Sequence, residues 1–203
     1  MCTFPRRFGL AALLVILAVA TRLLPHQANF TAIGAVALVS GSYLGLTAAA
    51  SVTVSAMLLS DIFLGFYGLP IMVSVYGSLL VTAAMGRWAR PKHTLRWSRV
   101  GLGSLGGSVL FFLATNFSVW QYTALYPKTP AGLLHCYLAA LPFFRNSLVG
   151  DLCYVGLIFG SLEAFRAWRR VKQKRFSLVR ASGVAPTTTI GSSTVVGKSD
   201  FLV

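Results

Sequence analysis

Long apolar blocks alternate with short polar or Gly- and Pro-containing breaks along most of the 203-residue chain. A helix needs roughly 20 predominantly apolar residues to cross a bilayer core of about 30 Å. Six blocks approach this length: Phe8–Leu24, Thr31–Gly45, Leu46–Phe66, Leu69–Trp88, Arg99–Asn116 and Asn146–Arg166. The pattern therefore predicts an all-α, polytopic membrane protein with about six transmembrane helices.

The second block is short, and its boundary with the third depends on one stretch of sequence. Residues 31–66 are too many for one crossing and few for two, so a hinge must fall near Gly41-Ser-Tyr-Leu-Gly45. A path with five crossings stays open at this point.

A further apolar stretch, Ala131–Leu141, lies between the fifth and sixth blocks. Thr129-Pro130 before it is typical of a helix start, with an N-cap and a proline at the first helical position. Pro142 follows it, and a helix of this length spans only about 17 Å, which is too short to cross. We expect a separate interfacial helix, or lid, that ends at Pro142.

Composition supports a membrane setting. The chain is 56% hydrophobic and 11% charged, with a mean hydropathy of +0.72, so it has too little polar surface for a soluble domain of this size. Its net charge of +14 is large. Because the bases flank apolar blocks and do not form a basic face with interleaved aromatics, the charge indicates membrane topology and excludes nucleic-acid binding.

The basic residues give the predicted path a direction. On a six-crossing path that starts inside, fifteen of the eighteen Lys and Arg residues fall on the inner side. Basic residues gather at the cytoplasmic ends of membrane helices, so both termini are predicted to be cytoplasmic. The run Arg166–Arg175 is expected to contact anionic lipid, with binding of a partner protein as the alternative. The three bases on the outer side are Arg22, Lys128 and Arg145.

The two ends of the chain carry further expectations. Arg6-Arg7, the apolar run after it and Ala18-Val19-Ala20 also resemble a secretory signal with a cleavage site, which stays an alternative. Beyond residue 175 the chain is rich in Ser, Thr and Gly and has no helical period. We expect residues 1–175 to form the six-helix transmembrane domain and residues 176–203 a disordered cytoplasmic tail.

Polar residues within the apolar blocks are the candidates for function. Asp61 and Asp151 both fall in the outer half of their predicted helices, where an acid needs a partner or a water-filled cavity. Other polar side chains on the predicted outer side are Arg22, His26, Asn29, Tyr76, Asn116, Trp120, Tyr126, Lys128, Arg145 and Asn146. This gathering of polar side chains predicts a pocket that opens to the outside.

Structural roles for the same residues stay open. Asp61 can pair with Arg22 or Arg145 to hold the bundle together, and Asp151 can pair with Arg145. Trp120, Tyr122 and Tyr126 fit an aromatic belt at the membrane interface. His26 follows Pro25, which favours a turn residue over a ligand or base.

Five sequence blocks resemble a family of uncharacterised bacterial membrane proteins described as transport proteins. They are Arg22-Leu-Leu-Pro-His-Gln-Ala-Asn-Phe, Ser60-Asp-Ile-Phe-Leu-Gly-Phe, Asn116-Phe-Ser-Val-Trp, Tyr126-Pro-Lys-Thr-Pro-Ala-Gly-Leu and Pro142-Phe-Phe-Arg-Asn-Ser-Leu-Val-Gly-Asp. That family is similar to the substrate-binding S components of energy-coupling-factor (ECF) vitamin transporters, and the resemblance covers roughly residues 20–165.

The resemblance implies a multi-pass protein of the bacterial plasma membrane that binds a small, vitamin-like solute in an outward-facing pocket. It implies docking with a transmembrane scaffold and two ATPases. The candidate pocket residues that it implies are Asn29, Asp61, Tyr76, Asn116, Trp120, Lys128, Arg145, Asn146 and Asp151. S components commonly dock through A-x-x-x-A in their first helix, and Phe8–Leu24 has no such pair, which puts the coupling in doubt.

From the chemistry of these side chains, Lys128 and Arg145 are expected to attract an anionic group, and the two aspartates to orient donors or balance those bases. Tyr76, Trp120 and Tyr126 are expected to stack on an apolar ring. The solute itself is not identified.

Enzymatic chemistry has little support in the sequence. An intramembrane aspartyl protease uses G-x-G-D, and Leu148 stands where the first glycine is needed before Gly150-Asp151. Neither a Walker A motif nor H-E-x-x-H is present. Cys2, Cys136 and Cys153 have no metal-ligand spacing, so no cofactor is expected. The alternative to transport is a membrane scaffold or assembly factor that acts through its cytoplasmic tail.

Overall fold

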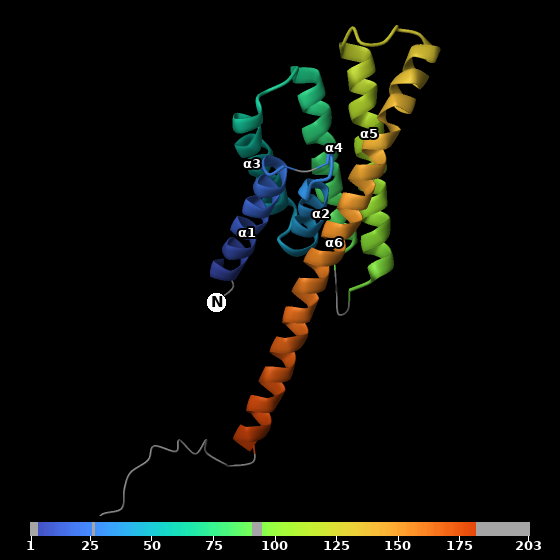
Figure 1. Ribbon diagram of the computed structural model, residues 1–203. Coiled ribbons are helices and arrows are strands. Elements are labelled where there is room, and N and C mark those ends of the chain that lie inside the picture. The colour runs from blue at the N-terminus through green and yellow to red at the C-terminus, as the bar shows by residue number, and fades with distance from the viewer. Residues whose placement is uncertain (1–3, 26, 91–94, 182–203) are drawn as a thin grey trace, which may run out of the picture. The chain divides into compact units, whose positions relative to one another are not determined.

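The computed structural model describes residues 4–25, 27–90 and 95–181, and this part of the chain is all-α. Its six helices are α1 (Phe4–Leu23), α2 (Ile33–Tyr43), α3 (Leu46–Leu64), α4 (Leu69–Trp88), α5 (Trp97–Tyr122) and α6 (Pro130–Ala181) (Figure 1). Contacts divide the chain into two compact units, Met1–Glu163 and Ala164–Val203. The all-α class is confirmed for the described residues, which form six helices.

Four of the described helices are long and apolar enough to cross a membrane: α3, α4, α5, and the part of α6 from Pro130 to Gln173. Large apolar side chains stand exposed on each of them, among them Phe63, Val73, Leu102 and Leu157. Apolar surface of this extent is stable against lipid but not against water. These properties are those of a multi-pass membrane protein.

The predicted second crossing, Thr31–Gly45, is shorter than expected and lies inside the bundle. The helix covers only Ile33–Tyr43, about 17 Å at 1.5 Å per residue, and residues 35–42 are all buried. It contacts α1, α3, α4 and α5, and Tyr43 packs on Phe159 of α6 with ring centroids 5.4 Å apart. A short helix is tolerated at membrane depth when protein surrounds its ends.

The hinge predicted near Gly41–Gly45 is confirmed. Helix α2 ends at Tyr43 and α3 begins at Leu46. Gly45 between them has φ +95°, a left-handed conformation that glycine adopts without a steric penalty.

The predicted separate lid helix over Ala131–Leu141 is wrong, because α6 continues through Pro142 without ending. The predicted helix start is confirmed, since the Thr129 hydroxyl accepts a hydrogen bond from the N–H of Gly132 at 3.1 Å. Proline removes one backbone donor, but ending the helix there would free several more polar groups at membrane depth. Continuing the helix through Pro142 therefore costs less free energy than ending it there.

Successive helices run in alternating directions through the first unit (Figure 1). The α3–α4 and α5–α6 connections lie at one end, which is the predicted outer end, the α2–α3 connection lies towards the other, and α2 begins part-way between the two ends. The alternation fits an up-and-down bundle in which α2 is a half-length element.

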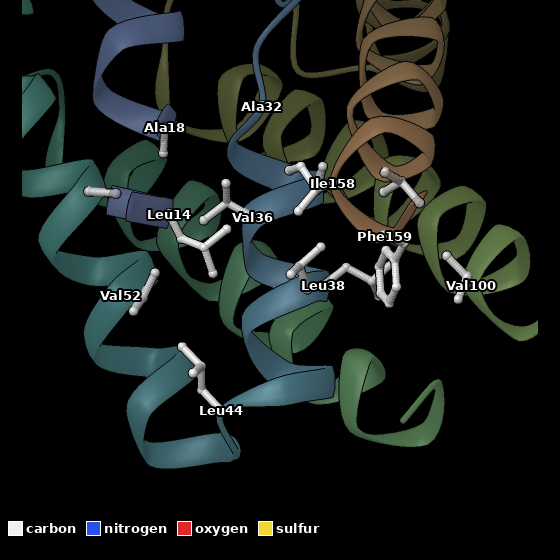
Figure 2. Packing of buried hydrophobic residues seen from close by; sticks show 14 of the residues in the cluster. Leu14, Ala18, Ala32, Val36, Leu38, Leu44, Val52, Val100, Ile158 and Phe159 are labelled. Carbon is white, nitrogen blue, oxygen red and sulfur yellow. The ribbon is translucent and has the colours of Figure 1, made fainter. Parts of the chain in front are cut away.

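The apolar core lies around α2 (Figure 2). Leu14 and Ala18 of α1, Val36 and Leu38 of α2, and Phe159 of α6 are almost completely buried in one cluster. Fully burying a side chain of this kind stabilises the fold by roughly 1.5–3 kcal/mol. Because α2 supplies many of these side chains, its position fixes how the longer helices pack.

Glycines allow α2 and α4 to approach closely. A Cβ atom at Gly41 would overlap the carbonyl oxygen of Ala83, and one at Gly86 would overlap that of Leu38. At Gly156 and Gly160 of α6, in contrast, a Cβ would meet nothing within 4 Å.

Helix α6 reaches Ala181, so the expected tail boundary at residue 175 falls inside a helix. The expected disorder beyond Ala181, the turn role of His26 and the thiol of Cys2 lie outside the described residues.

Candidate functional site

A cavity of ≈ 300 Å³ lies within the first unit, and all six helices contribute to its wall. Its apolar side chains are Ile33, Met57, Leu64, Val75, Leu79 and Phe111. Its polar side chains are Arg22, Asn29, Thr31, Thr82, Ser147 and Asp151. The volume and the mixture of an apolar wall with a few polar groups are typical of a site for a small molecule.

Asp61 is the centre of a hydrogen-bonded network beside the cavity. Arg22 Nη2 lies 2.7 Å from Asp61 Oδ1, and the Tyr76 hydroxyl donates to Oδ2 at 2.8 Å. The Arg22 Nη1 also contacts Met57 Sδ at 2.6 Å. The network joins α1, α3 and α4, so the pairing of Asp61 with Arg22 is confirmed. Of this group, only Arg22 and Met57 line the cavity.

Tyr67 lies in the connection between α3 and α4, close to this network. Burial and the negative charge of Asp61 raise the pKa of Tyr67 to about 12, although Arg22 acts in the opposite direction. The phenol therefore stays neutral at physiological pH.

Asp151 of α6 lies at the N-terminus of α2. Its Oδ2 accepts a 2.7 Å hydrogen bond from the Ser108 hydroxyl of α5, and the backbone N–H of Ala35 is a further donor. A Cβ atom at Gly34 would overlap Oδ1 and lie 2.9 Å from the carboxyl carbon. Glycine at position 34 is therefore what lets the carboxylate reach the end of α2, whose unpaired N–H groups favour an anion.

The segment between α1 and α2 packs on α6 beside the cavity. Asn146 Nδ2 donates to the carbonyl oxygen of Ala28 at 3.2 Å, and the rings of Phe30 and Tyr154 lie 5.7 Å apart. Asn29 in this segment has φ 62° and lines the cavity. The segment is held by contacts with α6 at the edge of the cavity.

Asn116 belongs to a smaller neighbouring cavity of ≈ 110 Å³, which shares Asn29, Phe111 and Ser147 with the larger one. Its side-chain amide donates to the Phe112 carbonyl of its own helix at 2.8 Å.

Trp120 and Lys128 meet at the α5–α6 connection and line neither cavity. The Lys128 ammonium donates to the carbonyl oxygens of Trp120 and Thr123 and lies 5.7 Å from the Trp120 ring centroid. A cation at this place satisfies the carbonyls at the end of α5.

Arg145 is exposed and lines neither cavity. The structure therefore separates the two predicted anion-attracting cations from both cavities. Asp151 has no ion pair with Arg145 or with any other described basic residue.

A family model matches residues 3–174, which is most of the chain. The chain belongs to the family of unknown function DUF6580. No curated protein and no solved structure matches it. The DUF6580 match gives no link to ECF S components.

Several residues at the candidate site of this DUF6580 protein were not anticipated from the sequence. Thr82, Gly107 and Phe111 line the cavity, and Ser108 holds Asp151. A stripe of small residues on α5, at positions 103, 104, 107 and 108, recurs at helical spacing and was a readable signal for a packed face. This face meets Leu38 of α2 and Thr82 of α4, and its Ser108 donates to Asp151 of α6. No cluster of three or more potential metal ligands occurs among the described residues.

Proposed function

We propose that this DUF6580 protein binds a small solute in the ≈ 300 Å³ cavity and acts in its transport across the bacterial plasma membrane. The observation that carries this proposal is the Asp151 carboxylate, which is 8% exposed and lines a cavity between membrane-length helices. An acid within a membrane protein is costly, so its place in a cavity wall favours a functional role.

The cavity wall is built from all six helices, which supports transport of the solute over static binding of it. Because every one of the six helices contributes at least one lining residue, a shift of any helix would change the shape of the cavity. A transporter needs this coupling, since binding must bias the protein between conformations.

Uptake in the manner of an ECF S component is the more specific form of the proposal. Arg22 in the last turn of α1 and Asn29 between α1 and α2 fall on the predicted outer side and line the cavity, which agrees with an outward-facing site. Asn29 and Asp151 of the expected set line it. Coupling to a scaffold and ATPases would require a docking pattern other than A-x-x-x-A in α1. On this proposal the protein is not an enzyme.

A scaffold role is the second candidate, and the second unit favours it. Phe165 and Trp168 stack with ring centroids 6.0 Å apart on the last part of α6. Arg169 lies 4.7 Å from the Phe165 ring centroid, and Lys172 lies 5.4 Å from that of Trp168. Cations beside exposed aromatic rings suit an anionic membrane surface or an acidic partner.

The charge bias predicts a cytoplasmic C-terminus and an external α5–α6 connection. We expect alkaline phosphatase to be active when inserted after Ala124 and inactive when fused after Val203, because the enzyme folds only outside the cytoplasm. Green fluorescent protein at the same two positions should give the opposite pattern. Phosphatase activity at both positions would contradict the six-crossing path.

Solute binding is tested with a cavity-filling variant. We expect at least one compound in a panel of vitamins, nucleobases and other metabolites to raise the Tm of the detergent-purified protein. Val75→Phe, which places a larger side chain in the cavity wall, should abolish that shift. The matched control is Val73→Phe, because Val73 lies on the same helix and is 63% exposed.

Two outcomes contradict the proposal. One is the absence of stabilisation by any compound while both variants fold as well as the wild type, which would favour the scaffold role. The other is an equal Tm shift in the wild type and Val75→Phe, which would place binding outside this cavity.

A further inference from the structure

The ≈ 300 Å³ cavity holds one carboxylate that no described basic side chain balances. Among the described residues Arg22 is the only basic one in its wall, and its guanidinium already pairs with Asp61 at 2.7 Å. The known partners of Asp151 are uncharged donors, the Ser108 hydroxyl and the Ala35 backbone N–H. Arg22, Asp61 and Asp151 together therefore carry one formal negative charge.

Asp151 also has unused capacity to accept hydrogen bonds. A carboxylate offers about four lone-pair sites. Ser108 and Ala35 occupy two of them, and Asp151 lies in the cavity wall, so the remaining sites are within reach of a solute. In contrast, Asp61 is paired with the Arg22 guanidinium and does not line the cavity.

We propose that the cavity takes a small solute with a protonated nitrogen group, such as an amine, an amidine or a protonated nitrogen heterocycle, and that this group binds Asp151. The inference rests on the proposed solute-binding function and names the class of its substrate. The N-terminus of α2 carries about half of an elementary positive charge, which stabilises the carboxylate but does not neutralise it. A cationic solute completes the neutralisation.

An anionic solute fits this site poorly. It would meet the like charge of Asp151 in surroundings of low dielectric constant, where repulsion is strong. Lys128 and Arg145, which the sequence offered as partners for an anion, line neither cavity. Arg22, the one basic residue that lines the cavity in the described part of the chain, would have to leave Asp61 to neutralise an anionic solute.

The rest of the wall sets the size and character of the solute. Leu64, Val75, Leu79 and Phe111 present hydrocarbon and one aromatic ring. A cavity of ≈ 300 Å³ is at the lower end of the range for small-molecule sites, about 300–1,000 Å³. The expected solute is therefore compact, with the nitrogen group attached to a single ring or a short hydrocarbon body.

The test uses three probes of one shape and different charge: benzamidine (cation), benzamide (neutral) and benzoate (anion). Binding to the full-length protein in detergent is measured by titration calorimetry at millimolar probe concentrations. Wild type should bind benzamidine about tenfold or more tightly than either of the other probes, because only benzamidine forms a charge-assisted pair with the carboxylate.

Variants locate the interaction. Asp151→Asn should weaken benzamidine about tenfold or more and leave benzamide within about threefold, since the change removes charge and keeps volume. Glu163→Gln is the matched control, because Glu163 is on the same helix, accepts a 2.9 Å hydrogen bond from Tyr43 and does not line the cavity. If Asp151→Asn fails to fold, the ranking of the three probes on wild type decides by itself.

The outcomes separate this inference from the proposed function. Benzoate or benzamide binding as tightly as benzamidine would overturn the cationic class and leave a solute cavity in place, as would a screen that yields only anionic or neutral ligands. Benzamidine binding that Val75→Phe leaves unchanged would overturn the assignment to this cavity. Failure of all three probes on wild type also overturns the cationic class, and the metabolite screen then decides on solute binding separately.

Discussion

Replacing Arg22 with alanine is expected to destabilise the protein by about 3 kcal/mol or more, because removal of one partner from a buried ion pair leaves an uncompensated charge. The partner is Asp61, whose side chain is 1% exposed. The Tyr76 hydrogen bond alone would then stabilise the carboxylate. The loss should appear as unfolding at lower denaturing-detergent fraction, followed by helical circular dichroism in mixed micelles.

Two further variants test whether the unpaired charge of Asp61 causes the loss of stability. Arg22→Met combined with Asp61→Asn should recover much of the stability lost in Arg22→Ala, because neither side of the pair then carries a charge. Arg145→Ala is the control, since Arg145 is an exposed arginine near the same end of the bundle, and its loss should cost less than about 0.5 kcal/mol. Equal stability of Arg22→Ala and Arg145→Ala would contradict a structural role for the ion pair.

The fold was predictable to the extent that local sequence decides it. Apolar block length and the glycine-rich hinge located α3 and α4 almost to the residue, since a bilayer-spanning length is a property of the segment itself. Pro142 misled the prediction for α6, because the decision to continue a helix through proline depends on the neighbours that surround the freed carbonyl. The burial of α2 likewise depends on contacts with other helices.

The site was predictable in its chemistry but not in its pairing. Membrane-embedded acids are rare enough that Asp61 and Asp151 stood out from the sequence alone. Which base each one meets is set by tertiary structure: Asp61 pairs with Arg22, while Asp151 meets Ser108 and no described base. A long basic side chain such as that of Lys128 can reach several positions, so the sequence did not show that Lys128 would donate to carbonyl oxygens at the end of α5.

The second large loss of stability is expected for a substitution at Gly86, where α2 packs on α4. Gly86→Ala is expected to destabilise the protein by about 1–3 kcal/mol, although alanine is the better helix former, because overpacking outweighs propensity here. The new methyl group would overlap the Leu38 carbonyl oxygen and lie 3.1 Å from the backbone nitrogen of Ser42. Both are backbone atoms, so no side-chain rotation relieves the clash.

A hydrogen bond across the same contact prevents easy separation of the helices. The Ser42 hydroxyl donates to the Gly86 carbonyl oxygen at 2.7 Å, and both residues are buried. Moving α4 away to accommodate a methyl group would lengthen this hydrogen bond. It would also open the contact at Gly41, which packs so closely on α4 that a Cβ there would overlap the Ala83 carbonyl oxygen. Strain at position 86 therefore adds to the loss of neighbouring interactions.

Gly77→Ala separates packing from helix propensity. Gly77 is also inside α4, but a Cβ there would meet nothing within 4 Å, so this variant should be unchanged or gain up to about 1 kcal/mol. Both variants are compared with wild type by the same denaturing-detergent titration. If Gly86→Ala is as stable as Gly77→Ala, the close approach of α2 and α4 does not limit stability. Its loss relative to Gly77→Ala measures what the glycine contact contributes to holding the buried half-length helix in place.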